Sequence, residues 1–581
     1  MRKGNVMKRR FFCCLSLLRA GSSIIGLVAL LSSPAASAVG FWTPLTSTAP
    51  DSVELMLLLP DGTVMGANNP SDITGAIGSK WYRLTPDNHG SYINGTWTTR
   101  TAASYSRLFY SSEILQDGRV FVAGGEYGTG GSTAEIYDPV ADSWTTLPSS
   151  GQTFKDSNSK VRPDGTVLVA PVNPTTTRGT VIYDPVANSW SAGPATRVTQ
   201  DETCWVKLPD GSILTADPDN VNSERYIPSS NLWVADAAVP VSLYANLPGY
   251  IGETGPAFLL PDGRAFFIGG AGHTAFYTPS GNNNPGTWTA GPDIPNGLVA
   301  ADAPGAMMPN GKILCAVAPA PYVDGGGNLQ FPTPTSFFEF DPVANTFTQV
   351  NSPSGGLTDN IPSYLATMLD LPDGTVLYSH VEQGNLFYSP FGSQLYAYTP
   401  DGVPVPSGKP TITGISLNND GSYHLTGLGL NGISEGAAYG DDAQMNTDFP
   451  LVRLTDGSGN IYYARTYNWS STGVMTGNSP VSTEFILPAF LPAGPYSLSV
   501  VANGIASDPV SFNGPIYVEF GYAGFQFGTM AFPFGTMALG VANVPLGGEI
   551  ILEGGGSSSE TMTISKPMTL TAIGAPSTIG Q

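Results

Sequence analysis

Short apolar runs alternate with polar turns along most of the chain, and one turn recurs. In each copy an apolar run leads into Pro-Asp-Gly or a close variant, and a second apolar run follows. Asp-Gly between two apolar runs predicts a β-hairpin, because glycine supplies the positive φ that a tight turn needs. The seven copies occupy residues 60–62, 116–118, 163–165, 209–211, 261–263, 309–311 and 372–374.

A second phrase follows the hairpins. It is clearest in Tyr-Asp-Pro-Val-Ala-(Asp/Asn)-Ser-Trp at residues 137–144 and 183–190. Two hairpins per period make four strands, and this period resembles the kelch repeat family across roughly residues 40–405, which implies a seven-bladed β-propeller. The seventh copy lacks a final strand, whereas residues 41–45 stand alone before the first hairpin. We therefore expect the N-terminal strand to complete the last blade and to close the ring.

The pattern changes twice after the repeats. After a proline-rich linker, alternating apolar and polar residues predict an Ig-like β-sandwich over residues 409–513. Residues 514–581 resemble the opening turns of a right-handed β-helix, which needs further coils or another domain to cover its face. The predicted fold class is all-β: a seven-bladed kelch-type propeller over residues 39–405, then the sandwich, then the short β-helix-like segment.

Residues 1–38 have the pattern of a signal peptide. A basic stretch precedes an apolar run, and Ala36-Ser37-Ala38 has the small side chains that a signal peptidase accepts. Cleavage after Ala38 leaves 18 basic residues against 45 acidic ones, a net charge of −27. A surface this acidic repels phosphate backbones, so we expect no nucleic-acid partner. No later segment is long enough to span a membrane, so the expected location is extracellular or periplasmic.

Two cysteines remain after cleavage, Cys204 and Cys315, and both fall in apolar strand patterns. In an oxidising compartment they are compatible with a disulfide or with two separate buried thiols. Their spacing does not indicate a metal cluster.

A kelch propeller joined to a sandwich resembles the galactose oxidase and glyoxal oxidase family of secreted enzymes. The resemblance implies oxidation of alcohols or aldehydes with oxygen at a copper ion, held by a Tyr-His pair before the last hairpin, a Cys-linked tyrosine and a histidine of a sandwich loop. Tyr364 matches the family tyrosine, but Leu365 stands in the place of the histidine. Ala443 stands in the place of the second histidine. We therefore expect no copper cofactor and keep Tyr364 as a remnant of the family site.

Acidic residues recur nine or ten positions before the hairpin glycines, where each innermost strand starts beside the central channel. Clustered carboxylates suit a hard cation such as Ca²⁺ and accept hydrogen bonds from sugar hydroxyls. Two of them could also act as acid and base in glycoside cleavage. The alternative is that they are turn and strand-cap acids in a chain that is acidic throughout. The candidates are Asp156, Asp201, Glu202, Glu253, Asp302 and, slightly earlier, Asp359.

Asp441 and Asp442 are weaker calcium candidates at the sandwich edge, where an Asp- and Asn-rich turn often only satisfies its own backbone. Together the patterns favour a non-catalytic secreted propeller that binds a glycan or an extracellular protein partner through its channel face and blade loops. Two alternatives stay open. One is a copper radical oxidase whose ligands have moved, and the other is a structural envelope or matrix protein that docks through residues 514–581.

Overall fold

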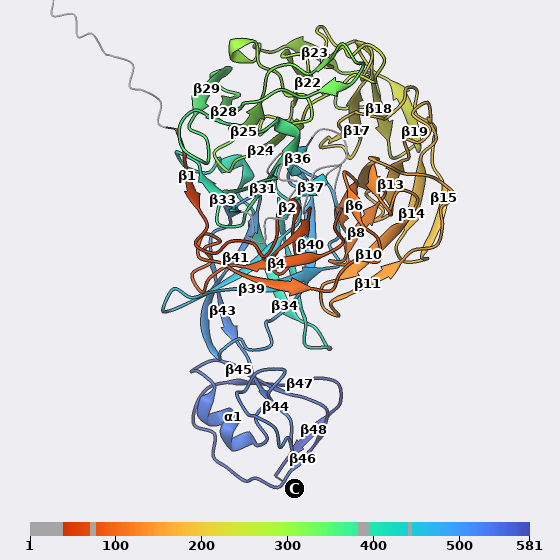
Figure 1. Ribbon diagram of the computed structural model, residues 1–581. Coiled ribbons are helices and arrows are strands. Elements are labelled where there is room, and N and C mark those ends of the chain that lie inside the picture. Colours follow the sequence, from red (N-terminus) through yellow and green to blue (C-terminus); the bar gives the residue numbers. More distant parts are fainter. Residues whose placement is uncertain (1–38, 70–76, 382–393, 440–443, 581) are drawn as a thin grey trace, which may run out of the picture. The chain divides into compact units, whose positions relative to one another are not determined.

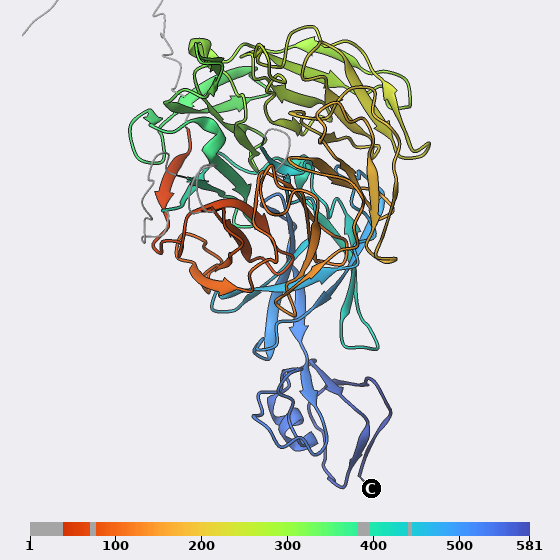
Figure 2. The same cartoon turned by 45° about the vertical axis from the view of Figure 1, so that its right-hand side comes forward.

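The computed structural model describes residues 39–69, 77–381, 394–439 and 444–580. Six four-stranded antiparallel sheets succeed one another around a ring (Figures 1 and 2). Five of them are continuous in sequence: β2 (Val53–Leu58), β3 (Val64–Asn68), β4 (Trp81–Thr85) and β5 (Thr96–Arg100); β7 (Ser111–Ile114), β8 (Val120–Ala123), β10 (Ala134–Asp138) and β11 (Ser143–Thr146); β12 (Asn158–Val161), β13 (Val167–Ala170), β14 (Val181–Asp184) and β15 (Ser189–Ala192); β16 (Val206–Lys207), β17 (Ile213–Ala216), β18 (Ser223–Ile227) and β19 (Leu232–Ala235); β20 (Ala257–Leu259), β21 (Ala265–Ile268), β22 (Thr274–Thr278) and β23 (Thr287–Ala290).

The sixth four-stranded sheet joins the two ends of the repeat region. β31 (Ala366–Asp370), β32 (Val376–His380) and β33 (Tyr396–Thr399) come from the last copy, and β1 (Phe41–Pro44) pairs antiparallel with β33. Trp42 packs its ring against Tyr378 and Tyr398 of this sheet. The prediction that the N-terminal strand completes the last blade is confirmed.

The remaining hairpin copy, residues 309–311, lies in a larger sheet, so the predicted count of seven separate blades is not confirmed. This seven-stranded sheet contains β24 (Pro304–Met307), β25 (Ile313–Val317), β28 (Thr335–Asp341) and β29 (Thr346–Val350). β30 (Thr358–Asp359) pairs with β28, and a hairpin of β36 (Gly436–Tyr439) and β37 (Gln444–Asn446) pairs with β24. The sequence pattern placed that hairpin in a loop of the C-terminal domain, because local periodicity does not show which distant strand a segment will pair with.

The first strands of neighbouring sheets contact one another, as β2 contacts β31, β7 contacts β12 and β16 contacts β20. They therefore surround the centre of the ring. In the third sheet, Gly165 adopts φ +82° and the Asp164 carboxylate accepts a hydrogen bond from Thr166 N at 3.1 Å. This is the local reason that Asp-Gly marks the hairpins.

Several shorter elements lie between the main strands described above. They are the strand pairs β6 (Arg107–Leu108) with β9 (Tyr127–Gly128) and β26 (Tyr322–Val323) with β27 (Leu329–Gln330), and the 3₁₀ turns η1 (Pro295–Gly297), η2 (Ser363–Leu365) and η3 (Pro406–Gly408).

Eight strands within residues 411–428 and 451–514 form one hydrogen-bonded sheet that curls around a shared apolar core. The core includes Leu425, Val452, Phe485 and Leu498. β39 pairs with both β38 and β40, so the two halves of the domain are joined in one sheet. The Ig-like sandwich of two separate sheets therefore stays a prediction. The strands are β34 (Thr411–Leu417), β35 (Tyr423–Leu428), β38 (Leu451–Asp456), β39 (Ile461–Tyr467), β40 (Pro480–Ile486), β41 (Gly494–Ala502), β42 (Ile505–Ala506) and β43 (Val510–Gly514).

Residues 516–579 contain parallel strand pairs, the kind of pairing that a β-helix has, and the β-helix itself stays a prediction. Ile516 lies beside Ile550, and Ile550 lies beside Leu570, in successive parallel strands. Within this segment, where the sequence pattern predicted only strands and turns, residues 537–543 form the helix α1, which Thr536 caps by accepting a hydrogen bond from Leu539 N. No helix in the described residues has the length and apolar character that a membrane crossing requires. The elements are β44 (Ile516–Val518), α1 (Met537–Asn543), β45 (Glu549–Leu552), β46 (Gly556–Ser558), β47 (Thr569–Ala572) and β48 (Ser577–Ile579).

Candidate functional site

Five of the six predicted carboxylates lie just before the first strand of a sheet. Asp156 precedes β12, Asp201 and Glu202 precede β16, Glu253 precedes β20 and Asp302 precedes β24. Because these first strands surround the centre of the ring, the loops that lead into them converge at one end of it.

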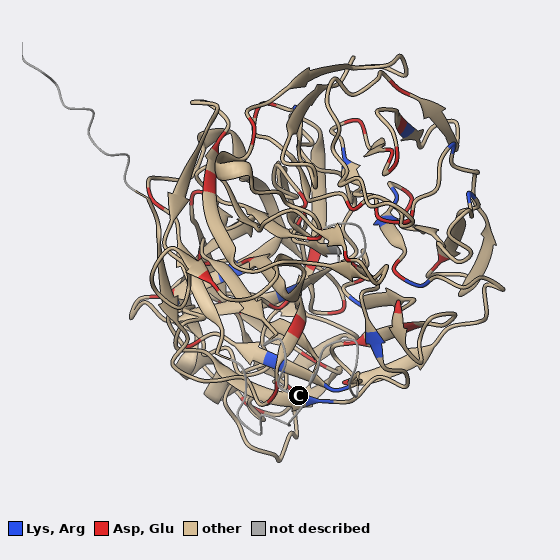
Figure 3. Cartoon of the chain, turned by 45° about the horizontal axis from the view of Figure 1, so that its top comes forward, with Lys and Arg blue, Asp and Glu red and all other residues tan. Residues whose placement is uncertain are grey.

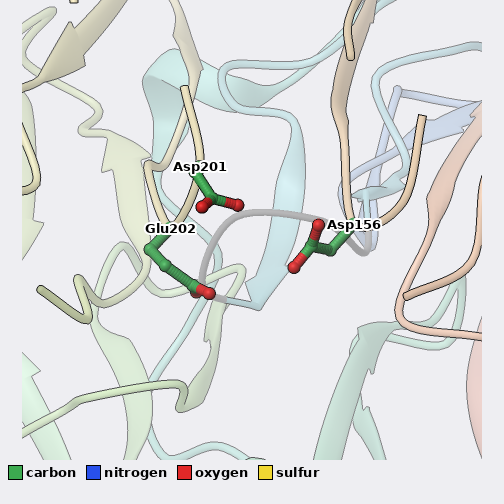
Figure 4. Close-up of side chains that lie close together, drawn as sticks. All are labelled: Asp156, Asp201 and Glu202. Carbon is green, nitrogen blue, oxygen red and sulfur yellow. The ribbon is translucent and has the colours of Figure 1, made fainter. Parts of the chain in front are cut away.

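The convergence is close. One carboxylate oxygen from each of Asp156, Asp201 and Glu202 lies within 4.8 Å of the other two, and the same is true of Glu202, Glu253 and Asp302. Figure 4 shows the first group, with the three carboxylates directed toward a common space from two separate segments. Glu202 belongs to both groups, so the five residues form one carboxylate cluster. Asp156, Asp201 and Glu253 are buried, and Glu202 and Asp302 are half-buried.

The backbone at these positions is held in an unusual conformation. Glu202 has φ +59°, Asp302 has φ +44° and Lys155, next to Asp156, has φ +57°. Residues other than glycine rarely adopt positive φ, and such conformations persist where the surrounding structure fixes them, often at binding or catalytic sites. A residue with positive φ thus stands shortly before three of the inner strands, β12, β16 and β24.

Burial and mutual repulsion favour the neutral forms of these acids. Burial raises the pKa of Asp156 to about 6, and burial with the charge of Asp156 raises the pKa of Asp201 to about 7. Burial, opposed by a hydrogen bond from Glu253 and reinforced by the charge of Asp156, raises the pKa of Asp302 to about 7. Burial and the charge of Asp302 raise the pKa of Glu253 well above its ordinary value. Over the whole chain, 45 acidic residues stand against 24 basic ones. Figure 3 shows both kinds along the backbone.

Glu126 is a sixth acid in this environment that the sequence analysis missed. Burial raises its pKa to about 8, and the charges of Asp156 and Asp302 add to the shift. Glu126 follows the second strand of its sheet rather than preceding the first, so counting back from the hairpin glycines does not reach it. The Gly124-Gly125 pair before it was the available signal, since consecutive glycines at a strand end mark a close backbone approach. Lys155 Nζ donates to the Glu126 carbonyl at 3.4 Å, so a basic group also borders the cluster.

The other predicted site residues do not join the cluster. Asp359 lies in β30, where its Oδ1 accepts a hydrogen bond from Ser354 Oγ, and it belongs to neither carboxylate group. Asp441 and Asp442 lie outside the described residues. Of the six carboxylates predicted to form a ring, the structure therefore brings five together, and these lie on four loops that lead into inner strands.

Arg197 and Val198, which shortly precede Asp201 in the chain, help to line a polar cavity of about 270 Å³. Glu224 accepts hydrogen bonds there from Arg197 N at 2.7 Å and Gln200 Nε2 at 2.8 Å, and burial raises its pKa to about 7. Carboxylate, amide and hydroxyl groups in one cavity match the hydrogen-bonding needs of a hydroxyl-rich ligand. The lining residues are Arg197, Val198, Asp217, Asn222, Ser223, Glu224, Ala235 and Asp236.

Two residues at the family copper position, Tyr364 and Leu365, supply no histidine, and the third, Ala443, lies outside the described residues. Leu365, in place of a histidine, is buried, and Tyr364 packs its ring against Phe331 and Phe109. Three histidines each face an oxygen of a different partner: His89 faces Gly459 O, His273 faces Asp293 and His424 faces Glu484. Among the described residues, groups of three potential ligands contain carboxylates only, and oxygen donors suit hard cations rather than the copper chemistry of imidazole and thiolate sites.

Cys204 and Cys315 are two separate buried thiols, one of the two arrangements that the sequence left open. Burial raises the pKa of each thiol to about 12, so both stay protonated and unreactive. Arg107, near the channel, donates to Gly130 O, Thr133 O and Glu135, which makes it a structural residue.

The ring of four-stranded sheets with its repeated hairpins is a β-propeller arrangement. The family model of the Kelch motif matches residues 115–151. A search of curated proteins found no match. Among solved structures, the chain is similar to a novel fungal alcohol oxidase with catalytic diversity among the AA5 family, in complex with copper: TM-score 0.51, 16% identity, 82% of this chain and 99% of that chain covered. The suspected resemblance to galactose-oxidase-like propellers is confirmed for the fold.

Proposed function

We propose that this chain is a non-catalytic binding propeller that takes a hydroxyl-rich ligand, a glycan or a glycan-bearing surface partner, at the carboxylate end of its channel. The observation that carries the proposal is the convergence of Asp156, Asp201, Glu202, Glu253 and Asp302 from four loops. Carboxylates accept hydrogen bonds from sugar hydroxyls, and the polar cavity beside Glu224 offers further acceptors and donors.

The test is binding of purified residues 39–581 to a panel of neutral and acidic oligosaccharides, measured by calorimetry. We expect binding to at least one class of oligosaccharide and its loss in the double variant Asp156→Asn/Asp201→Asn. Asp359→Asn is the control for each single variant, Asp156→Asn and Asp201→Asn, because it removes one buried carboxylate that lies outside the cluster. If the double variant bound the oligosaccharide as tightly as Asp359→Asn does, the ligand would have to bind outside the carboxylate cluster.

A second candidate function is oxidation of an alcohol or aldehyde at copper, which the similarity to the AA5 alcohol oxidase favours. It is tested by copper content after loading and by oxygen consumption with galactose, glyoxal and simple alcohols. Stoichiometric copper together with peroxide production would replace the binding proposal with the oxidase. Absence of both would leave the glycan proposal.

A further inference from the structure

We infer that the carboxylate cluster binds a divalent cation of the Ca²⁺ class, with Glu202 and Glu253 as central ligands. The inference deepens the proposed function, since it assigns a cation to the same site. It does not depend on which glycan, if any, the site accepts.

The first argument is the spacing of the oxygens. Two ligands that each lie about 2.3–2.6 Å from one Ca²⁺ are at most about 5 Å apart. The oxygens of Glu202, Glu253 and Asp302 lie within 4.8 Å of one another, as do those of Asp156, Asp201 and Glu202. Each group therefore needs only small side-chain adjustments to contribute three ligands to one ion, and Glu202 links the two groups.

The second argument is that one buried carboxylate oxygen of the cluster, Oε2 of Glu253, has no hydrogen-bond partner in the part of the chain that the structure describes. Glu253 is only 4% exposed, and its side chain is hydrogen-bonded to Glu202 and Asp302, but its Oε2 has no hydrogen-bond partner among the described residues. A buried carboxylate oxygen without a partner destabilises the folded state. Because an oxygen of this side chain lies within 4.8 Å of those of Glu202 and Asp302, a cation between them would satisfy it.

The third argument is the balance of charge. Five carboxylates converge in the cluster, and the basic group that borders it is Lys155, whose Nζ lies 3.4 Å from the carbonyl oxygen of Glu126. Like charges at this separation cannot all ionise together. Either protons or a cation must neutralise the cluster, and oxygen-only donors favour Ca²⁺, Mg²⁺ or Mn²⁺.

The test uses residues 39–581 stripped with EDTA and then titrated with CaCl₂ at pH 7.5, followed by calorimetry and by thermal unfolding. We expect saturable binding in or below the millimolar range typical of extracellular calcium modules, and a rise in Tm. Repeating the titration in buffers of different ionisation enthalpy should show proton release, because Ca²⁺ displaces protons from the cluster.

Glu253→Gln and Glu202→Gln are each expected to weaken Ca²⁺ binding more than about tenfold, since ligand charge sets the affinity. Asp359→Asn is expected to bind Ca²⁺ as the unmodified chain does. Near-UV circular dichroism identifies a variant that fails to fold. If Glu253→Gln does not fold, Ca²⁺ binding by Glu202→Gln remains as the test, because Glu202 is only half-buried. No heat and no Tm shift with Ca²⁺, Mg²⁺ or Mn²⁺ would overturn the inference, and so would equal affinity in all variants.

The glycan proposal fails separately. Oligosaccharide binding that persists in EDTA, with no Ca²⁺ binding, would keep the glycan site and remove the cation. Ca²⁺ binding without any oligosaccharide binding would keep the cation and remove the glycan.

Discussion

The repeated Tyr and Asp or Asn of the outer hairpins bond to each other across the turn. Tyr137 Oη donates to Asp142 at 2.7 Å, and Tyr183 Oη donates to Asn188 at 2.9 Å. Asp142 and Asn188 both have φ +50°, a conformation that Asp and Asn tolerate better than other side chains. Each copy of the Tyr-Asp-Pro repeat needs a residue that adopts positive φ and also accepts a hydrogen bond from the tyrosine hydroxyl. This requirement explains why Asp or Asn recurs at that position.

This pairing gives the first prediction. Asn188→Ala should lower the free energy of unfolding by about 1–2 kcal/mol, because it places a Cβ-bearing residue at positive φ and leaves the Tyr183 hydroxyl without its acceptor. Asn188→Gly removes the same hydrogen bond but tolerates positive φ, and it should cost less. Urea denaturation of both variants measures the difference. An alanine variant as stable as the glycine variant would contradict the role assigned to the backbone conformation.

The carboxylate cluster gives a prediction about pH. The pKa of Asp201 is about 7 in the folded protein against 3.8 for the free side chain, so the folded state binds more protons than the unfolded state between about pH 4 and 7. Stability from this group is present below pH 4 and is lost as pH rises through 7. Without added cation, Asp201→Asn should therefore be more stable than the unmodified chain at pH 8 by about 1–3 kcal/mol.

Thermal unfolding in EDTA at pH 5 and pH 8 measures this effect. The groups whose charges act on Asp201 are Asp156, Lys155 and Asp219, and all are unchanged in the variant. The difference between the two proteins should shrink at pH 5, where both side chains are neutral. An equal difference at both values would mean that packing, rather than ionisation, causes it.

At the scale of elements, the hairpin of β36 and β37 is tied to the ring by buried charges. Lys207 of β16 lies 3.0 Å from Asp448 and 3.5 Å from Glu435, and Lys160 of β12 lies 3.1 Å from Glu435. All four side chains are nearly or fully removed from solvent. Lysines on two inner strands thus hold a hairpin that belongs, in sequence, to the C-terminal region.

Lys207→Met should therefore destabilise the protein by about 3–5 kcal/mol, because it leaves Asp448 buried without its cation. The same substitution at Lys409, whose partner Asp508 is 86% exposed, is the control and should change stability by less than about 1 kcal/mol. Guanidinium chloride unfolding compares the two. A small loss for Lys207→Met would show that the hairpin is held by its strand pairing with β24 rather than by charge.

Elements whose structure depends on nearby residues were predictable, and those that depend on distant partners were not. Asp-Gly between apolar runs marked hairpins such as residues 163–165, because turn chemistry is local. The pairing of residues 436–446 with β24 carries no local signal. The segment 534–539 has strand-like apolar residues, but a Thr536 cap and Ala538 within the helix favoured α1 instead.

At the scale of the whole molecule, the site could be predicted only in part. The blade repeat placed Asp156, Asp201, Glu202, Glu253 and Asp302 at equivalent positions, and closing the ring brings them together. The same count included Asp359, whose strand pairs with β28 instead, and it missed Glu126, which sits after a second strand. Distances among side chains from different blades follow from the geometry of the ring, which no single repeat contains.

Closure of the ring by β1 also sets the stability of the whole propeller. Trp42 packs against Phe337, Tyr378 and Tyr398, and its Nε1 donates to Asn351 O at 2.7 Å, so it joins the last sheet to the neighbouring one. Trp42→Ala should cost about 3–5 kcal/mol. It should also speed hydrogen exchange in β33, because loss of β1 exposes that edge.

Trp190, which caps the outer edge of an internal sheet and donates to Pro148 O at 2.9 Å, provides the matched control. Trp190→Ala should also lower Tm, but its effect on exchange should stay within its own sheet and the sheet beside it, because the chain continues on both sides of that sheet. In Trp42→Ala the two ends of the ring are no longer joined, so faster exchange should reach from β33 across β32 to β31. If exchange in β31 to β33 were equal in the two variants, β1 would be an ordinary outer strand rather than the closure on which the convergence of the carboxylates depends.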